Sequence, residues 1–193
     1  MSSYYTDSEL KNIGFRSVGQ NVLISKKASL YGVEKMEIGS NVRIDDFCFL
    51  SGNIKLGNYI LISVGCILYG SVDGIVMEDF STLAPRVNIH VDSDDYSGNS
   101  LTNPMVDMEF RNMKNGAVKI RKHVIIGSNS VVLPNVEIGE GSSVGAMSLV
   151  TSSIKPWTIN AGVPAKKLKE RSKELLKLEK EFLKKQEGNY SAF

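Results

Sequence analysis

The residues best suited to proton transfer gather in one short stretch of the chain. His90 precedes Asp94 and Asp95 by a few positions, and His123 is the one other histidine in the sequence. Imidazole titrates near neutral pH and is therefore the most common general base. A carboxylate with a pKa of about 4 is a weaker base at pH 7, but its charge attracts an ammonium group. The stretch from His90 to Asp95 could thus orient or deprotonate a nucleophile.

These residues stand at the start of a long polar segment, from about residue 92 to residue 117. Such a connection is too long for a turn, and loops that project from rigid scaffolds often carry function. His123 lies in a separate turn, where a lone histidine is usually solvated, so we expect it at the surface. The candidate catalytic residues are His90, Asp94 and Asp95, and the candidate substrate-binding residues are Asp73, Tyr96 and Asn103.

A repeat with a six-residue step predicts the scaffold that must position these side chains. Three steps make a coil of about 18 residues, and the residue four positions after each aliphatic anchor is short or β-branched. This pattern predicts an all-β fold, a parallel β-helix of about six coils whose anchors point inward. The anchors are Val18, Ile24, Leu30, Ile38, Ile44, Leu50, Leu56, Ile62, Leu68, Met77, Leu83, Ile89, Ile120, Ile126, Val132, Ile138, Val144 and Val150.

A β-sandwich is the alternative fold, because its short strands are also separated by turns at regular spacing. The anchors keep the six-residue step without a misfit within each coil, which favours the β-helix. Strict alternation, as in ordinary strands, and the 3.6-residue period of helices both fit these positions less well.

The chain reads as one domain with a cap at each end. Residues 1–17 form the N-terminal cap, residues 18–156 the β-helix with the inserted loop 92–117, and residues 157–193 the C-terminal segment. Thr6 and Glu9 have the spacing of a capping box and predict a short helix that ends at Gly14. The segment from Lys166 to Gln186 predicts an amphipathic helix with an apolar stripe of Leu168, Leu175, Leu178 and Phe182. Its basic residues form either a solvated polar face or an anion site near the start of the helix.

Composition excludes several classes of protein. The net charge of +2 gives no reason to expect a nucleic-acid partner. No apolar run approaches the roughly 20 residues of a membrane-spanning helix, and the first ten residues lack the layout of a signal peptide. We therefore expect a cytoplasmic protein. In a reducing compartment we expect Cys48 and Cys66, which lie one coil apart, to be buried thiols, with catalysis or metal binding as the alternative.

The end of the repeat resembles a known family. Residues 126–150 are unbroken hexapeptides, and residues 160–166 read Asn-Ala-Gly-Val-Pro-Ala-Lys. Together they resemble the hexapeptide-repeat acyltransferases, in particular galactoside and maltose acetyltransferases and enzymes that acetylate sugars of bacterial surface polysaccharides such as O-antigen. The resemblance covers residues 15–170. It implies a left-handed β-helix, a homotrimer with active sites between subunits, and acetyl-CoA as acyl donor without a metal.

The resemblance also implies where CoA binds. The pantetheine arm can follow a strand only where side chains are small, as at Ala146. Lysines stand where the family commonly has arginines, and a lysine can serve a phosphate as a point charge. Ser128 and Thr151 could equally be ordinary turn residues. The implied contacts to acetyl-CoA are Ser128, Ala146, Thr151, Ser152, Lys166 and Lys169.

The chain departs from this family at the catalytic base. Members carry a histidine where the chain enters the large loop, and Asp94 stands in that position here. An attacking hydroxyl must lose its proton in the transition state, whereas an amine is partly neutral near pH 7 and needs less help. We therefore expect direct acetyl transfer to an amino sugar carried on a nucleotide diphosphate, with Asp94 or Asp95 steering the amine.

Two other functions remain open. The chain could acetylate a sugar hydroxyl, with His90 or a carboxylate of raised pKa as the base, since burial can raise the pKa of an aspartate. It could also be a catalytically silent scaffold, because the family histidine is missing. The CoA-type ending and the polar loop argue against the scaffold.

Overall fold

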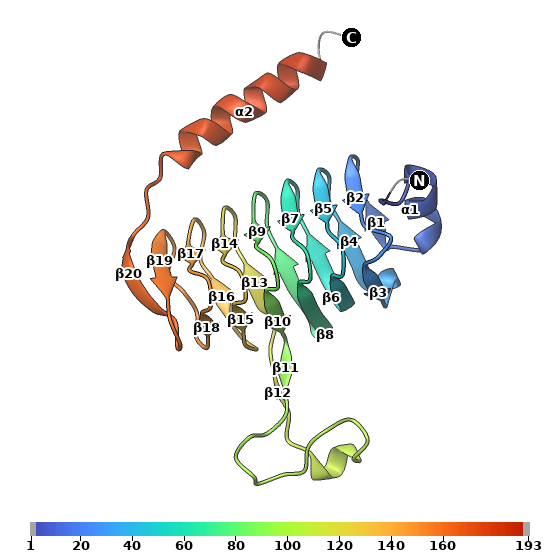
Figure 1. Ribbon diagram of the computed structural model, residues 1–193, viewed down its shortest axis with the longest axis vertical. Helices are drawn as coiled ribbons and strands as arrows, with labels where there is room; N and C mark the ends of the chain where they lie inside the picture. Colours follow the sequence, from blue (N-terminus) through green and yellow to red (C-terminus); the bar gives the residue numbers. More distant parts are fainter. Residues whose placement is uncertain (1–2, 191–193) are drawn as a thin grey trace.

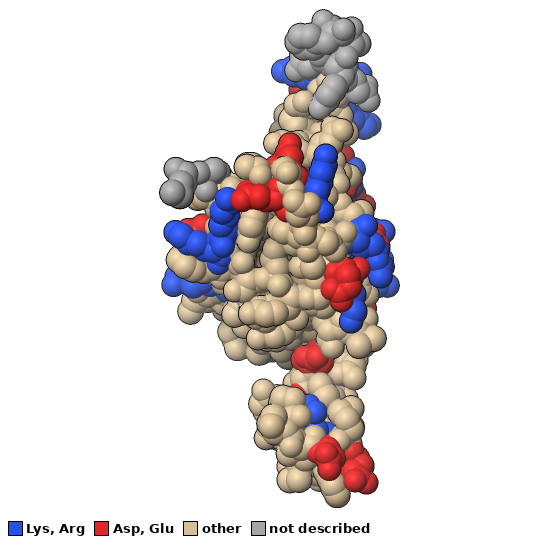
Figure 2. Space-filling view, turned by 90° about the vertical axis from the view of Figure 1, so that its right-hand side faces the viewer, with Lys and Arg blue, Asp and Glu red and all other residues tan. Residues whose placement is uncertain are grey.

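The computed structural model describes residues 3–190, with side chains up to Gln186. It is a parallel β-helix of about seven turns, with a helix at each end and an arm that projects from the middle (Figure 1). Charged side chains of both signs are interspersed on the surface shown in Figure 2, in keeping with the small net charge. Within residues 3–190, no helix is long and apolar enough to cross a membrane.

Three columns of parallel strands form the three faces of the β-helix, and the long strands β6 and β8 turn a corner and belong to two of them. The first face contains β1 (Ser17–Val18), β4 (Met36–Ile38), the ends of β6 (Phe49–Leu56) and β8 (Ile67–Met77), β13 (Val118–Ile120) and β16 (Glu137–Ile138). The second face contains β2 (Val22–Ile24), β5 (Val42–Ile44), β7 (Ile60–Ile62), β9 (Thr82–Leu83), β14 (Ile125–Ile126), β17 (Ser143–Val144) and β19 (Thr158–Ala161). The third face contains β3 (Ser29–Tyr31), the starts of β6 and β8, β10 (Asn88–His90), β15 (Val131–Val132) and β18 (Leu149–Val150).

The predicted core is confirmed. Every anchor is buried except Val18 and Leu30, which are half-buried in the first turn. The small residues four positions after the anchors also point inward, including both cysteines, which are free thiols. The β-helix has one incomplete turn more than the six coils predicted. Strand β19 adds this turn to the second face, and it was missed because its buried residues, Thr158 and Asn160, are polar and not aliphatic.

The corners of the β-helix require a left-handed backbone. The residue three positions after an anchor has positive φ at most corners, and Asn or Gly commonly fills this position. Tyr59, Phe80 and His123 adopt the same conformation, with φ between 57° and 61°. Their rings stack from turn to turn, with centroids 4.7 Å apart for Tyr59 and Phe80 and 5.3 Å apart for Phe80 and His123. Ring contacts therefore offset the cost of this backbone conformation.

The N-terminal cap is confirmed. Helix α1 (Asp7–Ile13) begins after Thr6, whose Oγ1 accepts the Glu9 N–H while the Glu9 carboxylate accepts the Thr6 N–H. It ends at Gly14, in the left-handed conformation typical of a helix C-cap. Leu10 of α1 is buried against the first turns.

The predicted C-terminal helix is wrong in its first part. Residues Lys166–Glu170 form β20, which pairs antiparallel with β19, and helix α2 (Leu175–Tyr190) begins only afterwards (Figure 1). The last turn leaves β19 as an open edge, and pairing with β20 satisfies its backbone groups. Leu168 is accordingly exposed and does not belong to an apolar helix stripe.

The first turns of α2 contact the corner of the β-helix that contains His123. Glu179 accepts hydrogen bonds from the Lys122 ammonium and, at 2.9 Å, from Nε2 of His123. Phe182 lies edge-on to Tyr59 with centroids 5.3 Å apart. The expectation that His123 is solvated is therefore wrong, because α2 covers the turn and leaves only 8% of the residue exposed.

This contact predicts a pH-dependent attachment of α2. Burial raises the pKa of the Glu179 carboxyl, but the hydrogen bonds from Lys122 and His123 outweigh it and hold that pKa below its ordinary value of 4.5. A lowered carboxyl pKa stabilises the folded state above pH 4.5, and this stability is lost as the pH falls through the lowered value. Amide hydrogen exchange should show α2 protected at pH 7 and increasingly open below pH 4.5.

Glu179→Gln should lower the protection of α2 at pH 7 by about 1.5 to 3 kcal/mol, the usual contribution of hydrogen bonds to a charged group. Glu181→Gln, on an exposed position of the same helix, is the matched control and should leave protection unchanged. An unaltered pH profile in the Glu179 variant would show that another group controls the attachment.

Candidate active site

The inserted segment leaves the β-helix as an arm at the corner between the third and first faces. Strands β11 (Asp92–Ser93) and β12 (Lys114–Asn115) pair antiparallel and form its stalk, and the tip contains the short helix η2 (Met108–Phe110) (Figure 1). His90 ends β10 directly before the stalk. The polar residues of the arm thus stand on a two-stranded stalk at one edge of the β-helix.

Asp94 is held in place but remains partly open to solvent. Its Oδ1 accepts a hydrogen bond from Nη2 of Arg111 at 3.1 Å, and its Oδ2 accepts the Asn103 N–H at 3.1 Å. The Arg111 side chain is 8% exposed and that of Asp94 is 32% exposed. An ordered carboxylate therefore faces solvent directly beyond the stalk, where a cationic ligand group could reach it.

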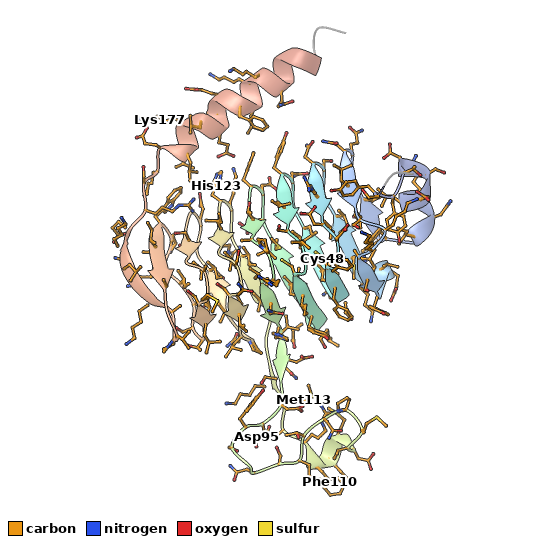
Figure 3. All side chains as sticks on the ribbon, viewed as in Figure 1. Cys48, Asp95, Phe110, Met113, His123 and Lys177 are labelled. Atoms are coloured by element: carbon orange, nitrogen blue, oxygen red, sulfur yellow. The ribbon has the colours of Figure 1, made fainter. Side chains whose placement is uncertain are left out.

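Asp95 has a different environment (Figure 3). Its carboxylate accepts the Ser97 N–H at 2.9 Å and the hydroxyls of Ser97 and Ser100 at 2.8 and 3.0 Å. These hydrogen bonds, led by the Ser97 N–H, lower the pKa of Asp95 to about 2. Such a carboxylate is a poor proton acceptor, so the geometry favours a role for Asp95 in holding the turn of the arm.

His90 is half-buried at the foot of the arm. Its ring stacks on Tyr69 of the preceding turn, with centroids 5.4 Å apart. Burial lowers the pKa of His90 below its ordinary value, so the imidazole is neutral at pH 7. A neutral imidazole can accept a proton, which keeps His90 available as a base.

The remaining candidate substrate residues have different positions relative to the arm. Asp73 lies on β8 between Tyr69, which pairs with His90, and Ile75, which pairs with Val118, so it occupies the same corner one turn before the arm. Tyr96 is almost fully exposed on the arm. Asn103 uses its side-chain oxygen to accept the Met105 N–H and therefore caps a turn of the arm itself.

The candidate CoA residues flank the third face beyond the arm. Thr151 and Ser152 follow β18, at the same corner from which the arm leaves. Ser128 and Ala146 lie at the opposite corner, where the Met147 N–H binds the Ser128 carbonyl at 2.8 Å. Gly127 passes so close to Ala146 that a side chain on it would collide with the backbone of Ala146. Small residues thus keep this corner narrow.

The two lysines do not lie together. Lys166 pairs with Ala161, beside the corner of Ala146, whereas Lys169 pairs with Ile159 farther along β20. A hollow beside Ser152 is lined by two further lysines, Lys155 and Lys167, which are not among the predicted CoA residues. Since strand β20 was predicted as helix, nothing in the sequence pattern placed Lys167 at this hollow.

Among residues 3–186, no three His, Cys, Asp or Glu side chains come together in a way that could hold a metal ion. The polar groups at the arm are instead organised by Arg111 and by hydroxyl and backbone donors.

Comparisons with known proteins agree with this geometry. Residues 117–152 match the family model described as bacterial transferase hexapeptide (six repeats). The dTDP-4-amino-4,6-dideoxy-D-glucose acyltransferase of Escherichia coli is 46% identical over 186 residues, which cover 93% of this chain and 95% of the relative. The chain belongs to the hexapeptide-repeat acyltransferases. Its β-helix is accordingly the left-handed type of that family.

Solved structures extend the likeness to ligand-bound enzymes of the family. AntD, an N-acyltransferase from Bacillus cereus crystallised with dTDP and 3-hydroxybutyryl-CoA, is 50% identical with a TM-score of 0.95, covering 97% of this chain and 100% of AntD. A serine-to-alanine variant of AntD, crystallised with dTDP-4-amino-4,6-dideoxyglucose and coenzyme A, is 51% identical, has a TM-score of 0.95 and covers 96% and 100% of the two chains. Alanine and asparagine variants of an AntD aspartate have also been crystallised with dTDP and coenzyme A.

Proposed function

We propose that this acyltransferase transfers an acetyl group from acetyl-CoA to the amino group of a nucleotide-linked amino sugar, such as dTDP-4-amino-4,6-dideoxyglucose. The observation that carries the proposal is Asp94, an ordered and partly exposed carboxylate directly beyond the stalk of the arm. A carboxylate suits an amine, which arrives as an ammonium ion, better than it suits a hydroxyl. The N-acyltransferase relatives support an amine as the acceptor.

The proposed chemistry is a direct transfer. Asp94 attracts the ammonium form of the acceptor, which gives up one proton to water, and the neutral amine attacks the thioester carbonyl carbon. The tetrahedral intermediate then expels the CoA thiolate as the C–S bond breaks. The proton shed by the new amide nitrogen passes to Asp94 or through water to the thiolate, and no bond to the enzyme forms. Positioning of the two reactants supplies much of the rate.

We further propose that CoA lies along the third face beyond the arm. Ser128 and Ala146 would flank the pantetheine chain on one side, and Thr151 and Ser152 on the other. Lys166 would meet a phosphate beside the narrow corner at Ala146. Exposure of Ala146, Thr151, Ser152 and Lys166 supports this placement, since none of these side chains is taken up by the core.

The arm supports a homotrimer with active sites between subunits. Its tip lies far from the β-helix of its own chain (Figure 3) and exposes large apolar side chains. A projecting patch of this kind is typical of an interface. We propose that the arm packs against a neighbouring subunit and brings Asp94 to a site that both subunits complete. The exposed apolar residues of the tip are Tyr96, Leu101, Met105, Met108 and Phe110, between 54% and 94% exposed.

The wider role that we propose is the synthesis of a bacterial surface polysaccharide such as O-antigen or capsule, in the cytoplasm. A relative from Escherichia coli, 31% identical over 147 residues that cover 73% of this chain and 71% of the relative, is a putative lipopolysaccharide biosynthesis O-acetyl transferase. Two free thiols, Cys48 and Cys66, suit a reducing compartment.

Acetylation of a sugar hydroxyl is the second candidate, favoured by the neutral imidazole of His90 at the foot of the arm. His90→Gln separates the two. It should lower activity by about 10²- to 10⁴-fold if His90 is the general base for a hydroxyl, whereas transfer to an amine should largely persist.

A thiol-release assay tests the proposed function. Acetyl-CoA and 3-hydroxybutyryl-CoA would each be offered with dTDP-4-amino-4,6-dideoxyglucose, with a dTDP-sugar that lacks the amine, and with a simple galactoside. We expect release only with the amino sugar. CoA at 100 times its Kd should also stabilise the fold by about 2.7 kcal/mol. If neither thiol release nor stabilisation by CoA is seen, the chain would instead be a catalytically silent scaffold.

Replacing Lys166 and Lys169 with alanine should raise KM for acetyl-CoA about tenfold, because the change removes the charge-assisted contact of Lys166 to phosphate. The KM for the amino sugar should stay nearly unchanged. Lys166→Ala alone should account for most of the effect, since Lys169 lies farther along β20. Lys180→Ala, on α2, is the control, and equal effects on both substrates would point to damage of the C-terminal segment.

A further inference from the structure

Three aromatic side chains form a row that the proposed chemistry does not use. Tyr31 of β3, Phe49 of β6 and Tyr69 of β8 project from successive turns of the third face (strands in Figure 1). Their ring centroids are 5.2 Å apart for Tyr31 and Phe49 and 4.9 Å apart for Phe49 and Tyr69. The row continues to His90 at the foot of the arm, 5.4 Å from Tyr69.

The β-helix does not need these rings for its core. Tyr31 is 56% exposed and Tyr69 is 40% exposed, whereas the anchors beside them point inward. Rings occupy the outward positions of the third face only before the arm. After the arm, the corresponding positions hold aliphatic or small polar residues, namely Val131, Leu133, Leu149 and Thr151. The row therefore lies on the side of the arm opposite the proposed CoA positions.

We infer that the aromatic row of Tyr31, Phe49 and Tyr69 binds the nucleobase of the acceptor, an inference that rests on the proposed function. A nucleobase is flat and aromatic, and bases stack on aromatic side chains with little dependence on sequence. In a nucleotide-linked sugar, a diphosphate and a pentose separate the base from the sugar. A base on this row, one to three rings away from His90, leaves the diphosphate and the sugar to extend past His90 along the stalk toward Asp94.

The test is isothermal titration calorimetry with dTDP on the full-length protein. Phe49→Leu and Tyr69→Leu should each weaken dTDP binding by about 5- to 150-fold, the fold-change that corresponds to loss of one stacked ring. Tyr69→Phe keeps the ring and should bind within about twofold of the wild type. Inorganic pyrophosphate, which has no base, should bind all variants equally weakly, and CoA affinity should not change.

Phe47→Leu is the matched control, because Phe47 is an equally apolar, 65% exposed ring that lies outside the row and contacts Lys27. It should bind dTDP like the wild type. Light scattering on every variant separates a ligand site from an interface: a loss of dTDP binding that accompanies dissociation of the oligomer would overturn the inference and assign the row to subunit contact.

Two failures can be told apart. If wild-type protein acylates the amino sugar and the leucine variants bind dTDP as tightly as it does, the inference is wrong and the proposed function stands. If the wild type binds neither dTDP nor UDP, both are wrong.

Discussion

Replacing Asp94 with asparagine should lower kcat/KM for the amino sugar by about 10²- to 10⁴-fold at pH 7, the usual contribution of a group that manages a proton. Asparagine keeps the size of the side chain and can still accept the Asn103 N–H, but it loses the charge that steers an ammonium. At pH 9 the amine is largely neutral, so activity should recover in part. Steady-state rates of thiol release at both pH values measure the effect.

The control must separate chemistry from loop structure, because Asp94 also binds Arg111. Arg111→Gln removes the same ion pair and leaves the carboxylate in place. We expect it to retain clearly more activity than Asp94→Asn. Equal losses in the two variants, with no recovery at pH 9, would mean that Asp94 acts only by holding the arm.

Ile126→Ala should lower the free energy of unfolding by about 2 to 4 kcal/mol, the cost of a large truncation in a packed core. Ile126 is fully buried on β14, where strands of the turns on both sides pack against it. Denaturant unfolding at one fixed protein concentration measures the change, since an oligomer's stability depends on concentration.

Its neighbour offers a matched control. Ile125 is 41% exposed on the same strand, and Ile125→Ala should change stability by no more than about 0.5 kcal/mol. A similar cost at both positions would contradict the inward direction of the anchors.

The β-helix was predictable because every anchor occupies the same kind of inward position in a repeated coil. Inward positions such as Ile44, Leu68 and Ile126 repeat one environment, so period alone reveals them. The capping box was predictable as well, because it depends only on Thr6 and Glu9, which are three residues apart in the sequence.

Features that depend on distant partners were not predictable. The run after Lys166 has a helical pattern, but the open edge of β19 pairs with it as a strand. His123 looked solvated because the helix that covers it comes some 50 residues later and meets it through Glu179. The aromatic row was missed for the same reason, since its rings become neighbours only when successive turns stack.

The candidate site was predictable in part. The spacing placed His90 and Asp94 at the start of the arm, and the structure has His90 at its foot and Asp94 directly beyond the two-residue stalk strand. It could not separate Asp94 from Asp95, because the difference lies in hydrogen bonds. Asp95 is occupied by Ser97 and Ser100, whereas Asp94 stays about one-third exposed.

A competition experiment tests direct acylation of a sugar amine most directly. Equal amounts of dTDP-4-amino-4,6-dideoxyglucose and of the matching dTDP-sugar with a hydroxyl at carbon 4 would share one reaction with acetyl-CoA. Mass spectrometry of the products should show acetyl on the amino sugar alone, in an alkali-stable amide, and no acetylated protein when the acceptor is left out. Acetyl on the hydroxyl sugar, or an acetylated enzyme, would contradict the account.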